Sequence, residues 1–77
     1  MVWDFHLRRT ELDQNIDRFY SISLTYSLLG MPGVMRTWGR LGAWGQTRLD
    51  WYDEEAEARL AISKLLLQKQ KKGYLLA

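Results

Sequence analysis

The stretch Arg18–Leu28, RFYSISLTYSL, decides the fold because its side chains alternate in character from one residue to the next. Large apolar and aromatic residues hold one parity, and small hydroxyl residues hold the other. A period of two is typical of a half-buried strand, with one face toward a core and the other toward solvent. This strand is expected to end at the turn Gly30–Gly33, Gly-Met-Pro-Gly. The residues of the apolar parity are Tyr20, Ile22, Leu24 and Tyr26.

Further strands are expected on both sides of this stretch. Residues 2–9 alternate in part and predict a short strand, and the polar residues 11–17 read as a connector. On the other side, residues 34–41 and 46–52 predict two strands joined by the tight turn Gly42–Gly45. Two strands joined by a short glycine-containing loop form a hairpin, so the sheet is expected to be antiparallel.

From Asp53 onward the period changes to that of a helix of about 20 residues. Asp53 is a plausible N-cap, acidic residues fill the first turns, lysines fill the last, and Gly73 follows. This order matches the helix dipole and the unpaired backbone groups at each end. The expected fold class is therefore α+β, a small antiparallel sheet packed against one long C-terminal helix. The expected core-facing stripe is Ala58, Ile62, Leu65, Leu66 and Lys69.

A second, narrower apolar stripe lies on the far side of this helix. It consists of Ala56, Leu60 and Leu67. One small sheet cannot easily cover both stripes. Either loops or the N-terminal segment cover the second stripe, or it contacts a second molecule.

The length and composition indicate one intracellular domain spanning residues 1–77, with a core of about 2–74. The chain has 77 residues, and a chain of this size buries only about 60 to 65% of its unfolded surface. Cysteine is absent, which suits a reducing compartment. Internal apolar runs such as Leu65–Leu67 are too short to span a membrane, and residues 1–13 lack a signal-peptide pattern. We therefore expect a cytoplasmic protein without a membrane partner.

Residues suited to catalysis are scarce. The chain has one histidine, His6, which is expected to be structural or exposed. The carboxylates of residues 53–57 are better explained by the helix dipole than by acid–base chemistry. The glycines at 39, 42 and 45 do not match a phosphate-binding loop. We therefore expect no enzyme activity, no metal and no cofactor.

Charge is distributed unevenly along the chain. From Arg18 to Leu49 there are four arginines and no Asp or Glu, although the whole chain carries only +2. In a strand, Arg36, Trp38 and Arg40 would share one face, and Arg48 of the returning strand would lie near them. Such a cation–aromatic–cation surface suits nucleic acid, because guanidinium groups pair with phosphate and an indole stacks on a base or packs on a sugar.

Two neighbouring residues extend this candidate surface. Gly39 would leave the backbone open to close approach, and Trp44 occupies a turn with little core to fill. The alternative is structural. Trp38 would then belong to the core, and the arginines would pair with Asp50 or Asp17.

The segment TWGRLGAWGQ, residues 37–46, resembles the signature of the WGR domain family, here Trp38-Gly39-Arg40. The resemblance extends over about residues 2–74. It includes Asp17-Arg18-Phe19-Tyr20 at the main strand, Gly45-Gln46, Tyr52 before the helix, Glu54-Glu55-Ala56 in its first turn, and Lys69 followed by Gly73-Tyr74 at its end.

This resemblance implies a small twisted antiparallel sheet packed on one helix. WGR domains occur in DNA-dependent poly(ADP-ribose) polymerases and in small stand-alone bacterial proteins, which this chain resembles in length. In the polymerases the tryptophan packs against DNA near a strand end, and the arginine contacts DNA and neighbouring domains. Those roles fall on Trp38 and Arg40, whereas Arg36 and Arg48 are added by strand parity and Trp44 is local to this chain.

Two functions therefore remain open. The first is a non-catalytic nucleic-acid-binding module, with DNA favoured over RNA. The second is a protein-interaction module, including a homodimer, that uses Ala56, Leu60 and Leu67 together with the apolar tail Leu75-Leu76.

Overall fold

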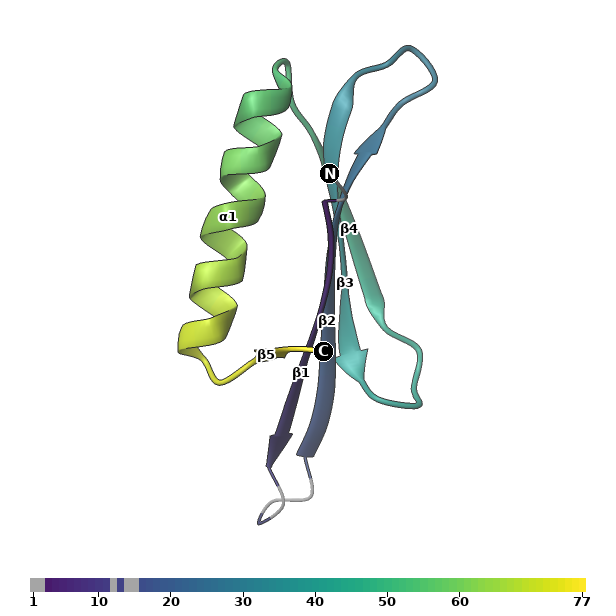
Figure 1. Cartoon of the computed structure of the whole chain (residues 1–77). Coiled ribbons are helices and arrows are strands. Elements are labelled where there is room, and N and C mark those ends of the chain that lie inside the picture. Colours follow the sequence, from purple (N-terminus) through teal and green to yellow (C-terminus); the bar gives the residue numbers. More distant parts are fainter. Residues whose placement is uncertain (1–2, 12, 14–15) are drawn as a thin grey trace.

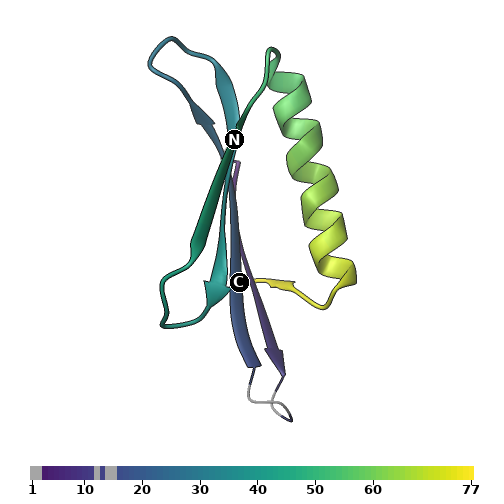
Figure 2. The same ribbon diagram turned by 180° about the vertical axis from the view of Figure 1, so that it is seen from behind.

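The computed structural model describes residues 3–11, 13 and 16–77 and shows one antiparallel sheet with a helix across one face. The expected α+β class is confirmed. The strands are arranged in the order β4-β3-β2-β1-β5. Figures 1 and 2 show α1 on one face of the sheet and none of the described elements on the other. The elements are β1 (Asp4–Glu11), β2 (Ile16–Tyr26), β3 (Pro32–Arg40), β4 (Gln46–Trp51), α1 (Glu55–Lys71) and β5 (Leu75–Leu76).

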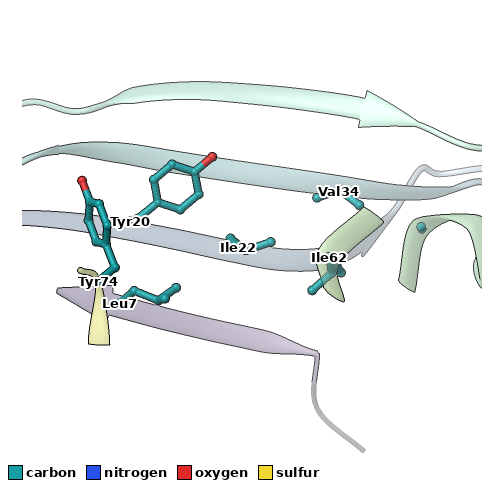
Figure 3. Packing of buried hydrophobic residues seen from close by; sticks show 7 residues of the cluster. Leu7, Tyr20, Ile22, Val34, Ile62 and Tyr74 are labelled. Atoms are coloured by element: carbon teal, nitrogen blue, oxygen red, sulfur yellow. The ribbon is translucent and has the colours of Figure 1, made fainter. Parts of the chain in front are cut away.

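The parity of β2 sets which residues face the helix. We call the sheet face toward α1 the inner face and the opposite side the outer face. Tyr20 lies between Leu7 of β1 and Trp38 of β3, and Ile22 lies between Phe5 and Arg36. These residues share the inner face, as the alternation predicted. The buried core consists of Leu7, Tyr20, Ile22, Val34, Ala58, Ile62 and Tyr74 (Figure 3).

The helix starts one residue later than expected, with Glu54 rather than Asp53 as its N-cap. The cause is the position of Glu57, which lies three residues after Glu54. The Glu57 carboxylate accepts a hydrogen bond from the backbone N–H of Glu54 at 3.2 Å, completing a capping box. From Asp53 the corresponding residue would be Ala56, which has no acceptor.

The helix ends at Lys71, and Gly73 follows its C-cap residue, Lys72, as the predicted stop signal. The φ angle of Gly73 is +96°, a left-handed conformation that favours glycine. The backbone N–H of Gly73 donates to the carbonyl of Gln70, and that of Tyr74 donates to Lys69, at 3.1 Å each. This Schellman motif reverses the chain, so that Tyr74 returns to the core and packs edge-on against Tyr20.

The N-terminal hairpin is longer than the expected strand and connector. Strand β1 continues to Glu11 and β2 begins at Ile16, so both ends of the predicted connector belong to strands. Polar cross-strand contacts hold this extension: Arg8 donates to Asp17 at 2.5 and 2.8 Å. Residues 12, 14 and 15 of the connector and Val2, the expected start of the first strand, lie outside the described residues.

The turn after β2 also lies earlier than expected, between Ser27 and Met31. Only Gly30 of the two flanking glycines has a positive φ, +84°. Gly33 belongs to β3, where a Cβ atom would come within 2.5 Å of the Trp51 ring. The second glycine therefore makes room for an aromatic side chain and takes no part in the turn.

The second apolar stripe of α1 is not covered by any segment of the described chain. Leu60 is 57% exposed and Leu67 is 56% exposed, so the expectation that loops cover them is wrong. The tail Leu75-Leu76 forms β5 and pairs with Leu7 and Arg8 at the edge of the sheet. Among the described residues, no helix is long and apolar enough to cross a membrane.

The two sides of α1 differ in what they contribute to stability. Ile62→Ala is expected to lower the free energy of unfolding by about 2–4 kcal/mol, because Ile62 is fully buried against the sheet. Leu60→Ala, on the exposed side, should cost less than about 1 kcal/mol. Urea unfolding followed by circular dichroism measures both, and equal losses would mean that the helix presents a different face.

Candidate nucleic-acid interface

Beyond the apolar core, the inner face is hollowed at the C-terminal end of α1. This hollow has a volume of about 550 Å³, and a smaller one of about 250 Å³ adjoins it beside Gly39. Aromatic rings of Tyr20, Trp38 and Tyr74 line it, and Arg40 lines the smaller part. We call the two together the basic hollow. Its other cations are Arg9, Arg18, Arg36, Arg48, Lys69 and Lys72.

Stacked aromatic rings join the core to the basic hollow. The rings of Tyr20 and Trp38 are nearly parallel, 18° apart, with centroids separated by 5.8 Å. The Lys69 ammonium lies 4.4 Å from the centroid of Tyr20, and the Arg36 guanidinium lies 6.0 Å from that of Trp38. Trp38 is thus half-buried against the core and also lines the hollow. The two sequence-based interpretations of Trp38 are therefore compatible.

Some cations of the basic hollow are partly neutralised. The Asp50 carboxylate accepts hydrogen bonds from Arg36 at 3.4 Å and from Arg48 at 3.1 Å, so one carboxylate pairs with two arginines. Arg9 pairs with Glu11. The expected alternative of pairing with Asp50 is confirmed for Arg36 and Arg48, and the strand register places both on the inner face with Trp38, as predicted.

Pairing of the arginine-rich segment with Asp17 does not occur. Asp17 lies on the outer face, where it binds the Arg8 guanidinium. The hydrogen bonds from Arg8 hold the pKa of the Asp17 carboxyl below its ordinary value, and Asp17 raises the pKa of Arg8 in return. The outer-face cation is therefore neutralised by its own partner.

Arg18 and Arg40 lie directly opposite each other on β2 and β3. The next pair along the two strands, Asp17 and Leu41, is hydrogen-bonded: the Leu41 N–H donates to the Asp17 carbonyl at 2.9 Å. Arg18 and Arg40 therefore form a non-hydrogen-bonded pair, in which Cα atoms lie about 4.5 Å apart. Neither makes an ion pair with a carboxylate of the described residues. Like charges placed in this way destabilise a sheet.

The last turns of α1 add cations that sequence reasoning did not assign to the site. Lys69 and Lys72 line the basic hollow and form no ion pair within the described part of the chain. Burial lowers the pKa of the Lys69 ammonium, and the charges of Lys72 and Arg36 lower it further. The charges of Lys69, Lys72 and Arg36 therefore lie close enough together to repel one another.

The remaining predicted site residues occupy different surroundings. A Cβ atom on Gly39 would lie 3.0 Å from the Gly45 backbone and 3.5 Å from the Phe19 ring. Gly39 is therefore required by packing within the sheet, and the expected open approach to its backbone is wrong on that side. Trp44 is fully exposed. It lies in the β3–β4 loop, at the same end of the molecule as the C-terminal end of α1 (Figure 1).

Two signals in the sequence could have revealed the added cations. Arg18 has the same parity as Tyr20 and Ile22, so the β2 alternation already directs it inward. Lys69 belongs to the core-facing stripe of the helix. A lysine fits in that stripe only where the helix extends beyond the end of the apolar core. Arg9 shares the parity of Leu7 in the same way.

Comparison with known proteins identifies the family of this chain. The model of the WGR domain family matches residues 3–77. The chain belongs to the WGR domain family. WGR domains are known as nucleic-acid-binding modules. Uncharacterized protein y4dW of Sinorhizobium fredii (strain NBRC 101917 / NGR234) is 33% identical over 69 residues, which cover 90% of this chain but 34% of that protein. The chain thus spans about a third of this relative. No solved structure matches the chain significantly.

The depressed pKa of Lys69 predicts a pH-dependent affinity for phosphate-bearing ligands. A bound anion favours the charged ammonium, so binding takes up protons as the pH approaches the lowered pKa. The affinity for a nucleic-acid ligand should therefore begin to fall at a lower pH than an ordinary lysine would give. Lys69→Arg keeps its charge as the pH rises and should flatten the profile. Identical profiles for the two proteins, measured by fluorescence anisotropy, would contradict a role for Lys69.

Proposed function

We propose that this WGR domain is a non-catalytic nucleic-acid-binding module that holds backbone phosphates, of DNA in preference to RNA, in its basic hollow. The observation that carries the proposal is the Arg18–Arg40 pair. Two arginines are paired across adjacent strands and line the same hollow as Trp38, without a carboxylate partner among the described residues. A bound phosphate would offset their repulsion and accept hydrogen bonds from both.

The other cations of the hollow support the same ligand. Arg36 and Arg48 share one carboxylate, which leaves this pair of cations with an excess of one positive charge. Lys69 and Lys72 approach from the helix, on the opposite side of the hollow from the strands. Cations placed on both walls can contact successive phosphates of one strand, whereas a flat patch would contact them from a single side.

The aromatic residues give this surface a contact for the sugar or base. Trp38 is fixed by its stacking on Tyr20 and lines both parts of the hollow, so its position does not depend on a ligand. Stacking of a base on an aromatic side chain contributes about 1–3 kcal/mol. Trp44, at the adjoining loop, is free to pack against a further nucleotide.

We also propose that this module does not act as an enzyme. The single histidine, His6, lies on the outer face with Nδ1 3.0 Å from the Ser21 hydroxyl. It is thus on the opposite side of the sheet from the basic hollow.

The exposure of Leu60 and Leu67 favours a second candidate function, docking of a protein partner on α1. This stripe, which includes Ala56, lies on the side of α1 away from the sheet. Both functions could therefore operate in one chain.

Removing an unpaired inner-face arginine should weaken binding in a salt-dependent way. Arg40→Ala and Arg18→Ala should each lower DNA affinity and reduce the slope of log affinity against log salt by about 1. Arg8→Ala is the matched control, because it removes the same charge from the outer face of the neighbouring strand. Tryptophan emission during titration with a short duplex, at two salt concentrations, measures the effect.

An equal loss of affinity in all three variants would mean that binding depends only on the net charge of the domain and not on where the arginines lie. Unchanged binding in Arg40→Ala and Arg18→Ala, with the fold intact by circular dichroism, would contradict the proposed site.

A further inference from the structure

Strand β4 is an unprotected edge of the sheet. It pairs with β3 on one side only. The Tyr52 N–H donates to the Pro32 carbonyl at 2.9 Å, which fixes the phase of the ladder. The even-numbered residues of β4, which have the same parity as Tyr52, therefore form backbone hydrogen bonds with β3. The backbone N–H and C=O groups of Thr47, Leu49 and Trp51 point away from the sheet. This edge contains no proline and no lysine, and its two charged residues, Arg48 and Asp50, are opposite in sign, so they do not by themselves repel a second copy of the strand.

From this edge we propose that two copies of the chain associate through β4. The two strands would run antiparallel about a twofold axis at Leu49 and join the two sheets into one. In this register Leu49 faces Leu49 of the second copy, and Thr47 faces its Trp51. These are the residues whose backbone groups point outward, so each facing pair can exchange both N–H···O=C hydrogen bonds.

The charges of β4 select the same register. With Leu49 at the centre, Arg48 of one copy faces Asp50 of the other, and the reverse pair forms across the axis. Both side chains lie on the inner face. They fall in non-hydrogen-bonded pairs, where facing side chains are closest, and opposite charges in such pairs stabilise a sheet. Asp50, which serves two arginines within one copy, would then gain a third.

Other registers lose these advantages. A centre at Arg48 or Asp50 places like charges opposite each other at the axis. A centre at Thr47 faces Arg48 with Gln46, and a centre at Trp51 faces Asp50 with Tyr52, so no charge is paired. The strand is therefore self-complementary in one register.

The outer face of β4 supplies apolar area for this contact. Leu49 is 42% exposed and Trp51 is 44% exposed. Joining two copies at β4 brings the two apolar patches together across the axis and removes part of them from water. This inference does not depend on nucleic-acid binding, although Arg48 also lines the basic hollow.

Sedimentation equilibrium from micromolar to millimolar protein tests the proposal. The native chain should reach twice its 9.1 kDa mass. Leu49→Lys places two lysines opposite each other at the axis and should raise the dissociation constant by about tenfold or more. Met35→Lys is the matched control, because it makes the same change on the same face one strand inward. Leu60→Glu, on the helix stripe, should leave the dimer intact.

A charge exchange tests the register itself. Arg48→Asp and Asp50→Arg should each weaken self-association, whereas an equimolar mixture should form the mixed dimer, in which every facing pair is opposite in sign. Circular dichroism confirms that each variant folds; should Asp50→Arg not fold, the comparison of Leu49→Lys with Met35→Lys decides. A monomer at millimolar concentration, or a dimer broken by Leu60→Glu and not by Leu49→Lys, would overturn the proposal.

Discussion

The alternation of β2 is the constraint on which the rest of the structure depends. Every second residue of this strand faces the helix, so one parity carries Ile22 into the core, Tyr20 to its boundary and Arg18 beyond it. Tyr20 is the junction, because Trp38 stacks on its ring and Lys69 lies above it. The core therefore positions the basic hollow directly. A change that moved Tyr20 would displace both the aromatic contact and the cations around it.

The basic hollow is held at an electrostatic cost. Arg18 and Arg40 face each other without a carboxylate partner in the described chain, and the pKa of Lys69 is depressed. On the outer face, by contrast, Arg8 is neutralised by Asp17. Proteins retain such unfavourable placements where function requires them, and the cost is met by packing elsewhere. Here the apolar core and the capped helix supply that packing, and an anionic ligand would remove the cost.

Features that depend on hydrophobic periodicity could be predicted from the sequence. Features that depend on individual polar contacts could not. The inner parity of β2, the facing of Arg36 and Trp38, and the core stripe of α1 were all predictable from spacing. The extension of the first hairpin was not, because it lies beyond the core and no apolar alternation marks it. The N-cap at Glu54 depends on one hydrogen bond from its backbone to Glu57. The contribution of Lys69 to the site required knowing where the core ends along the helix.

The measurement that tests the central claim most directly is a backbone and indole chemical-shift titration with a short DNA duplex at low salt. The account predicts perturbations confined to the inner face, at Arg18, Trp38, Arg40 and Lys69, that fade as salt is added. The outer-face residues, such as Arg8, should keep their shifts. Perturbations centred on the outer face, or no response at low salt, would contradict the assignment of the basic hollow as the nucleic-acid site.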